Sequence, residues 1–306
     1  MTTAVDPQYV ELTGPGGELT ARFAAGVGMV GCSLRHRGEE LLGLGGGLPA
    51  YLDHGAVFGI PLLYPWANRL SGWSYETAGR RVELDRSSPL LHGEEHCLPI
   101  HGALAATSDW RVTGTGEDWL TAELDFAAHD DLLGVFPFPH TLALDIRLGR
   151  SELRIATSVT AGDSSLVPLS FGFHPYLSLP GTDRRTWLVE LPARTEMALD
   201  ERRLPTGETT DRAPEQLVLG EQTFDDLFAV PTPATRFAVG GNGRRVTVEL
   251  TSGYPYAQIF APPDQPVICF EPMTAPIDAL RSHRGLRMVP PGGTADATFA
   301  IAIESR

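Results

Sequence analysis

Hydrophobic and polar side chains alternate with a period of two along much of this chain. Residues 142–148 place Leu or Ile at every second position, and after the turn at 149–151 the alternation resumes over 153–159. Successive side chains of a β-strand point to opposite faces of a sheet. The pattern therefore predicts a β-hairpin with one buried face.

The same alternation predicts strands along the rest of the chain and few helices. The further expected strands are 18–23, 80–84, 110–113, 120–126, 187–191, 246–250, 267–270 and 299–303. The 33 Gly and 25 Pro are scattered throughout, and no Pro- or Ser-rich linker divides the sequence. We expect a single all-β, antiparallel domain spanning residues 1–306, and the pattern alone fits two packed sheets as well as a barrel.

Charge narrows the classes of partner. The chain carries 24 basic and 38 acidic residues, a net charge of −14, and contains no Lys. A negative field repels phosphate backbones and anionic lipids, so we expect neither a nucleic-acid nor a membrane partner. The absence of Lys excludes Schiff-base catalysis.

The N-terminus lacks the basic start and apolar stretch of a signal peptide, and no apolar run is long enough for a membrane span, so we expect a cytoplasmic protein.

The cysteines and histidines show no metal-binding spacing. Cys32, Cys97 and Cys269 lie far apart in the sequence, and His92 and His96 sit in a proline-containing segment without the regular geometry that would converge on an ion. We expect reduced cysteines used in packing and no bound metal.

Residues 64–70 have a composition that suits a ligand with many hydroxyl groups. Asn68 and Arg69 offer directional hydrogen bonds, and Trp66 offers an apolar face against which the C–H side of a sugar could lie. The same segment is also typical of a surface turn with an ion-paired Arg.

Two histidines lie in short irregular segments. His101 precedes a glycine, and His174 lies among aromatic residues with its backbone restricted by Pro175. Because the ordinary pKa of His is near 6.5, a positioned imidazole can transfer protons at neutral pH. A structural histidine bonded to a backbone carbonyl fits either position as well.

Four further polar residues lie next to or within apolar stretches. Glu271 ends an expected strand that Pro272 interrupts, and burial there would raise its pKa and make it a competent base. A glutamate that reaches solvent at a strand end is the common alternative. Of Asp225 and Asp226, one could accept hydrogen bonds from a diol while the other caps a turn, and Gln258 places an amide in another apolar strand.

Taken in order, these segments resemble the aldose 1-epimerase, or galactose mutarotase, family over about residues 58–275. The matching residues are Asn68-Arg69, His101-Gly102, His174-Pro175-Tyr176, Phe224-Asp225, Gln258 and Glu271-Pro272. The resemblance implies a large antiparallel β-sandwich, the supersandwich, with no metal or organic cofactor. It also implies that His174 protonates the ring oxygen of a free aldose and that Glu271 removes the proton of the anomeric hydroxyl.

The resemblance assigns expected roles to the remaining residues as well. His101 would hold and polarise the region of the ring oxygen, while Arg69, Asp225 and Gln258 would bind hydroxyls and Asn68 would shape the adjoining wall. The only partner implied is a small-molecule sugar, and the protein would be a monomer or a homodimer.

Some positions differ from those of many family members and leave the identity of the sugar open. They are Phe173, Ala103 and Leu177-Ser178. Three other functions remain alternatives: a non-catalytic sugar-binding or regulatory homologue, a hexose-6-phosphate 1-epimerase, and a glycoside hydrolase that pairs Glu271 with Asp225.

Overall fold

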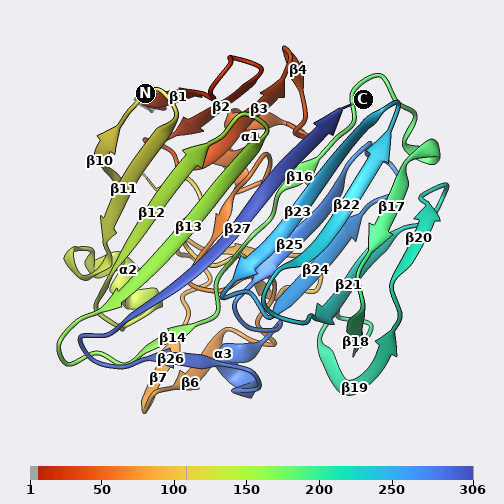
Figure 1. Cartoon of the computed structure of the whole chain (residues 1–306). Coiled ribbons are helices and arrows are strands. Elements are labelled where there is room, and N and C mark those ends of the chain that lie inside the picture. Colours follow the sequence, from red (N-terminus) through yellow and green to blue (C-terminus); the bar gives the residue numbers. More distant parts are fainter. Residues whose placement is uncertain (1–5, 108, 306) are drawn as a thin grey trace.

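The computed structural model describes residues 6–107 and 109–305, and β-strands make up about half of the chain (Figure 1). The helices within these ranges are short: α1 (Gly47–His54), α2 (Asp130–Val135) and α3 (Ala279–Ser282), with 3₁₀ turns at Phe126–Ala128 and Arg184–Thr186. None of the described helices is long and apolar enough to cross a membrane. The predicted all-β class is confirmed.

The largest sheet has nine antiparallel strands and contains the predicted hairpin. In spatial order its strands are β10 (Arg111–Thr115), β11 (Trp119–Asp125), β12 (His140–Leu148), β13 (Glu152–Ala161), β27 (Thr294–Ser305), β23 (Arg244–Ser252), β22 (Thr235–Gly241), β17 (Leu188–Leu191) and β20 (Glu215–Val218). Leu148 pairs with Leu153 across the predicted turn. The C-terminal strand β27 lies between β13 and β23, and so joins strands that are distant in the sequence.

A second large sheet has eight strands. Along its main path these are β19 (Pro205–Arg212), β18 (Arg194–Leu199), β21 (Phe224–Ala229), β24 (Tyr256–Ala261), β25 (Ile268–Met273), β15 (Gly172–Phe173) and β5 (Leu62–Leu63), and β16 (Tyr176–Leu177) also pairs with β25. β25 is therefore flanked by β24 on one side and by the short strands β15 and β16 on the other.

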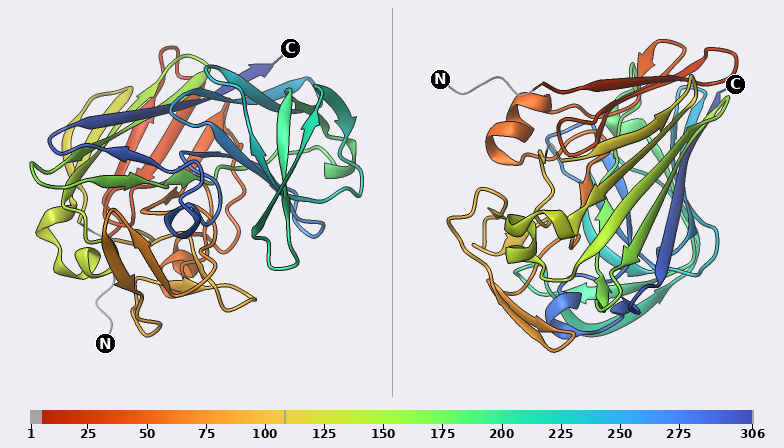
Figure 2. Two further views of the ribbon diagram at one scale, coloured as in Figure 1. Left: turned by 90° about the horizontal axis from the view of Figure 1, so that it is seen from below. Right: turned by 90° about the vertical axis from the view of Figure 1, so that its left-hand side faces the viewer.

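Smaller sheets and loops surround these two. They are the sheet of β1 (Tyr9–Thr13), β2 (Leu19–Ala24), β3 (Val30–His36) and β4 (Glu39–Glu40), and the pairs β6 (Ser74–Thr77) with β7 (Arg80–Glu83), β8 (His92–Gly93) with β9 (Pro99–Ile100), and β14 (Val167–Leu169) with β26 (Arg287–Val289). Apart from β5, which belongs to the eight-stranded sheet, much of the segment between β4 and β10 lies on the side of that sheet that faces away from the nine-stranded one (Figure 2).

The two large sheets pack face to face. The ring of Phe237 on β22 stacks on that of Phe270 on β25 with centroids 5.3 Å apart, and Phe173 on β15 contacts Phe299 on β27 at 4.9 Å. These contacts between inner faces are those of a β-sandwich and decide against a single closed barrel. The antiparallel sandwich expected from the resemblance is confirmed.

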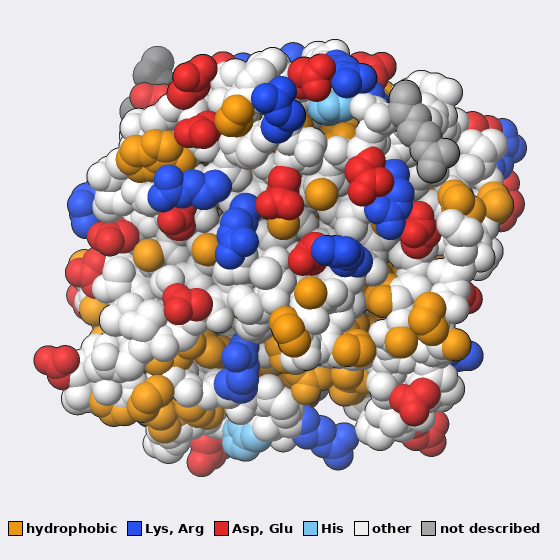
Figure 3. Space-filling model, in the orientation of Figure 1, with side chains coloured by type: hydrophobic (Ala, Val, Ile, Leu, Met, Phe, Trp, Pro, Cys, Tyr) orange, Lys and Arg blue, Asp and Glu red, His pale blue; other side chains and the backbone are white. Residues whose placement is uncertain are grey.

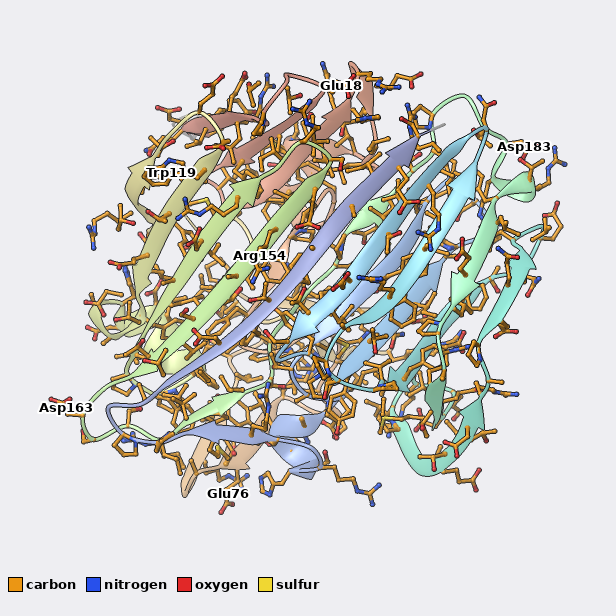
Figure 4. The ribbon with its side chains drawn as sticks, in the orientation of Figure 1. Glu18, Glu76, Trp119, Arg154, Asp163 and Asp183 are labelled. Atoms are coloured by element: carbon orange, nitrogen blue, oxygen red, sulfur yellow. The ribbon has the colours of Figure 1, made fainter. Side chains whose placement is uncertain are left out.

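The outer face of the nine-stranded sheet is solvated. On β13 the exposed Arg154 lies between the buried Leu153 and Ile155, and it is labelled on that face in Figure 4. Side chains of both charges are interspersed over this face in Figure 3, and Arg245 pairs with Glu190 at 2.8 Å. One buried and one wet face explain why the period of two is so clear in these strands.

The strand that carries Glu271 differs from the prediction. β25 continues through Pro272 to Met273, so that Glu271 lies inside a strand and not at its end. Pro272 is paired with Ala257 of β24, whereas no residue of β15 or β16 is in register with positions 270–272. A residue without an N–H is tolerated where one side of a strand lacks a partner.

A buried hydrogen-bond network ties the loop after β5 to β12. Nδ1 of His140 donates to the carbonyl oxygen of Phe138 at 2.5 Å, which leaves Nε2 to accept from the hydroxyl of Tyr64 at 2.5 Å. Burial raises the pKa of Tyr64 well above its usual range and lowers that of His140 to about 4. Both groups are therefore neutral. Tyr64 is held through its hydroxyl by His140 and through its carbonyl oxygen by the N–H groups of Ala103 and Leu104.

The buried neutral His140 predicts a loss of stability in mild acid. Unfolded His140 takes up a proton near pH 6.5 but folded His140 only near pH 4, so the unfolded state binds more protons between these values. The contribution is present above pH 6.5 and is lost as the pH falls to 4, by about 1.4 kcal/mol per pH unit and on the order of 3 kcal/mol in all. Urea unfolding of wild type and His140→Gln across this range should give a steeper decline for wild type, and parallel curves would contradict it.

Candidate active site

Three of the predicted site residues lie on adjacent strands, on the face of the eight-stranded sheet opposite the sandwich core. Because strand side chains alternate, Phe270 points into the core while its neighbour Glu271 points to the other face. Gln258 on β24 is in register with Glu271, and its Nε2 donates to Oδ1 of Asp225 on β21 at 2.6 Å. These residues are 13 to 46 positions apart in the sequence, and sheet pairing brings them together.

His174 lies opposite Glu271, in the short connection between β15 and β16. Its Nε2 is 3.1 Å from Oε1 of Glu271, and the two side chains are 6% and 1% exposed. The imidazole stacks on the ring of Tyr176 with centroids 4.3 Å apart, and its backbone N–H donates to the carbonyl oxygen of Pro61. The imidazole is thus fixed by stacking on one side and by the carboxyl group at its edge.

Burial sets the protonation of this pair. It lowers the pKa of His174 to about 3 and raises that of Glu271 well above its usual range, with the negative charge of Asp225 adding to the shift of Glu271 and Arg69 opposing it. A neutral imidazole beside a neutral carboxyl is therefore favoured. The ionised pair contains the same number of protons and differs only in the position of one of them along the 3.1 Å contact.

His101 and Asn68 lie in two loops that are bonded to each other. The carbonyl oxygen of Tyr64 accepts the N–H groups of Ala103 and Leu104, and the N–H of His101 donates to the carbonyl oxygen of Asn68. Gly102, with a φ of 72°, is required here because a Cβ would lie 2.1 Å from the oxygen of Tyr64.

Asn68 and His101 themselves adopt left-handed backbone conformations, with φ of 56° and 64°. Asn tolerates this region, whereas for His it costs on the order of 1–3 kcal/mol, a strain that is common at functional sites. The His101 ring lies 5.7 Å from that of His174. Burial, and after it the nearby His174 and Arg69, hold the pKa of His101 well below its usual range.

Arg69 is fixed by two acceptors. Its Nη1 donates to Oδ1 of Asn68 at 3.0 Å, and its Nε donates to Oε2 of Glu94 at 3.3 Å. Its Nη2 makes no hydrogen bond to any residue of 6–107 or 109–305, and its charge lowers the pKa of Glu271. The guanidinium therefore has donors left for a ligand beside the carboxyl pair.

Glu94 was missed by the sequence analysis because Glu94-Glu95-His96 looks like a solvated polar run. In the structure its Oε1 accepts the N–H groups of His96 and Leu98 while its Oε2 faces Arg69. Ligand atoms of these three residues lie within 4.8 Å of one another, but the carboxylate of Glu94 is committed to Arg69 and the loop. Within this cluster, the carboxylate of Glu94 therefore serves to hold the guanidinium of Arg69 in place.

Three expectations about single residues were wrong. Trp66 is fully buried and belongs to the core, so it cannot form the wall of a sugar pocket. Asp226 lies within β21, on the face opposite Asp225, and does not cap a turn. Cys97 is exposed, whereas Cys269 is buried as expected and all three cysteines are free.

Several buried polar atoms of the site have no hydrogen-bond partner among the described residues. They are Nδ1 of His101, Nδ1 of His174, Oε1 of Gln258 and Oε2 of Glu271. Leaving such atoms unbonded is unfavourable, and a ligand with many hydroxyl groups would satisfy both donors and acceptors. The arrangement can move protons to and from such a ligand through His174 and Glu271.

Comparison with known proteins identifies a family. The model of the protein family described as aldose 1-epimerase matches residues 32–302 of this chain. The uncharacterised protein YihR of Escherichia coli (strain K12) is 23% identical over 245 residues, which cover 76% of this chain and 74% of YihR.

Solved structures show the same fold. A galactose mutarotase-like protein from Clostridium acetobutylicum superposes with a TM-score of 0.83 at 20% identity, covering 98% of this chain and 99% of the other. Slr1438 from Synechocystis sp. PCC 6803 superposes with a TM-score of 0.78 at 22% identity, covering 100% and 99%. At these identities the likeness concerns the fold alone.

The buried Arg69–Glu94 pair predicts unequal effects of two neighbouring substitutions. Both side chains of the pair are 10% exposed, so Glu94→Ala leaves a buried cation without its partner and two N–H groups without an acceptor. We expect the free energy of unfolding to fall by about 3–5 kcal/mol. Glu95→Ala, at a side chain 78% exposed, should change it by less than about 0.5 kcal/mol. Urea unfolding measures both, and equal effects would show that the pair does not support the loop.

Proposed function

We propose that this chain, which belongs to the aldose 1-epimerase family, interconverts the α and β anomers of a free aldose by opening and reclosing the sugar ring. The observation that supports this most strongly is the buried contact of 3.1 Å between His174 and Glu271. The contact places one acid and one base beside further buried polar atoms that have no hydrogen-bond partner among the described residues.

Ring opening requires two proton transfers. Glu271 takes the proton of the C1 hydroxyl while His174 donates a proton to O5, and the C1–O5 bond breaks to give the open-chain aldehyde. This step needs the ionised form of the pair, because the acid must carry a proton and the base must lack one. Hydroxyls of the bound sugar and the nearby Arg69 favour that form by stabilising the carboxylate of Glu271.

Reclosure uses the opposite form of the pair. After rotation about C1–C2, neutral Glu271 returns a proton to the aldehyde oxygen while neutral His174 accepts the proton of the O5 hydroxyl as O5 attacks the other face of C1. The end of the first half-reaction is the start of the second, and no external proton is needed. Burial favours the neutral pair and hydrogen bonds from the bound sugar favour the ionised one, so both forms take part in the cycle.

The remaining residues bind and orient the sugar in this proposal. Arg69 donates hydrogen bonds to the sugar from Nη2. Asp225 and Gln258, on the next two strands of the sheet to one side of the strand that carries Glu271, bind its hydroxyl groups. His101, held neutral beside His174, supplies one ring nitrogen near the expected position of O5. These roles agree with those implied by the family resemblance.

Replacing the base separates catalysis from binding. Glu271→Gln preserves the size and a hydrogen bond to His174 but cannot accept the C1 hydroxyl proton, so we expect kcat to fall by about 10²- to 10⁴-fold while the Kd for the sugar changes little. Polarimetry of freshly dissolved α-aldoses measures the rate, calorimetry measures binding, and anomer-resolved NMR over a panel of aldoses identifies the substrate.

The matched control is Glu95→Gln, an exposed glutamate near the site that should leave both constants unchanged. Wild-type protein that binds an aldose without hastening its equilibration would make it a sugar-binding homologue. Release of reducing sugar from a glycoside would instead indicate a hydrolase. Either result overturns the proposal.

A further inference from the structure

The hairpin of β18 and β19 brings an arginine to the rim of the site. Nε of Arg203, in the turn between these strands, lies 3.4 Å from Oδ2 of Asp225, whose other oxygen accepts from Gln258 at 2.6 Å. The side chain of Asp225 is 22% exposed and that of Arg203 is 45% exposed. Both oxygens of the carboxylate are thus engaged, and the arginine reaches it from the solvent side.

The turn that carries Arg203 is held in place by its own hydrogen bonds. The carboxylate of Asp200 accepts the N–H groups of Arg202 and Leu204, and the carbonyl oxygen of Asp200 accepts the N–H of Arg203. Arg203 has a φ of 61°, in the left-handed region. These contacts fix the backbone from which the arginine extends.

Packing ties the same turn to the strand of the catalytic pair. Leu204 is 6% exposed and belongs to a small apolar cluster with Met273, two residues beyond Glu271, and Ala67, next to Asn68. The turn that carries Arg203 therefore packs in the same apolar cluster as neighbours of Glu271 and Asn68. This distinguishes Arg203 from an arginine on a free surface turn.

A carboxylate and a guanidinium together can recognise a single hydroxyl group. The carboxylate only accepts hydrogen bonds and the guanidinium only donates them, whereas a hydroxyl does both. A sugar hydroxyl that lies beside both groups can donate to Asp225 and accept from another N–H of the Arg203 guanidinium at the same time, and the charge on each partner strengthens both bonds. A sugar without that hydroxyl, or with it in the other orientation, leaves both partners unmatched.

From this geometry we propose that Arg203 is a specificity-determining residue, which acts with Asp225 to recognise one ring hydroxyl of the sugar. The proposal rests on the proposed function in that the ligand is an aldose. It adds a contact remote from the two proton-transfer groups, so that it acts on sugar binding and not on the chemical step.

The first experiment compares Arg203→Ala with Arg202→Ala. Arg202 is the adjacent arginine in the same turn, is 50% exposed and faces Asp200 at 3.7 Å, so it is a matched control. For the best aldose of the panel we expect Arg203→Ala to raise Kd and KM about 10- to 100-fold with kcat nearly unchanged, and Arg203→Lys to restore part of the loss. Arg202→Ala should leave Kd and KM within about twofold of wild type. Urea unfolding of all variants reports any general damage to the turn.

The second experiment uses monodeoxy aldoses to identify the hydroxyl. With one of them, wild type and Arg203→Ala should bind equally, because the group that Arg203 recognises is gone, and with the others the full difference should remain. A loss that is equal for every deoxy sugar, no loss at all, or an equal loss in Arg202→Ala overturns the proposal.

The binding measurements keep this proposal separate from the proposed function. Wild type that binds an aldose but does not hasten its equilibration refutes the epimerase activity, while the Kd values still decide the role of Arg203. A selective rise in Kd upholds that role even then. Wild type that binds none of the aldoses refutes both.

Discussion

The alternation of side chains along β25 is the constraint on which this molecule depends. Phe270 packs against Phe237 of the other sheet, and the next residue, Glu271, points to the opposite face. A shift of one residue in the pairing of β25 would bury Glu271 between the sheets and expose Phe270. The core of the sandwich thus fixes the register of the strand, and the register fixes the direction of the carboxyl group that the proposed chemistry requires.

Burial then gives the carboxyl group its properties. Glu271 is 1% exposed and faces His174 at 3.1 Å, so both groups favour their neutral forms and the ionised pair is reached by moving one proton. An exposed pair of the same residues would be screened by water and would hold ordinary charges. Burial on the same sheet that orients Glu271 therefore also raises its pKa, as the proposed proton transfers require.

Asp225 and Gln258 lie on β21 and β24, in the same sheet as β25, whereas the other polar residues around the pair are held by loops, each with its own anchor. Gly102 allows the His101 loop to approach the backbone of Tyr64, and Glu94 fixes Arg69. Arg203 comes from a third segment, the β18–β19 turn, which is anchored by Leu204. The residues proposed to bind hydroxyls from these loops are thus held by contacts that are separate from the packing between the two large sheets.

The sequence by itself determined the all-β class, the main hairpin, and the residues that resemble those of the aldose 1-epimerase family, because the period of two and the order of short segments are local properties of the chain. It did not determine that two sheets pack face to face, that β27 lies between β13 and β23, or that Trp66 is in the core, because these depend on contacts between distant segments. Glu94 and Arg203 had no sequence signal, since an acidic run and an arginine in a turn are typical of solvated surfaces. Only the tertiary structure gave them partners, by burying Glu94 against Arg69 and by directing Arg203 toward Asp225.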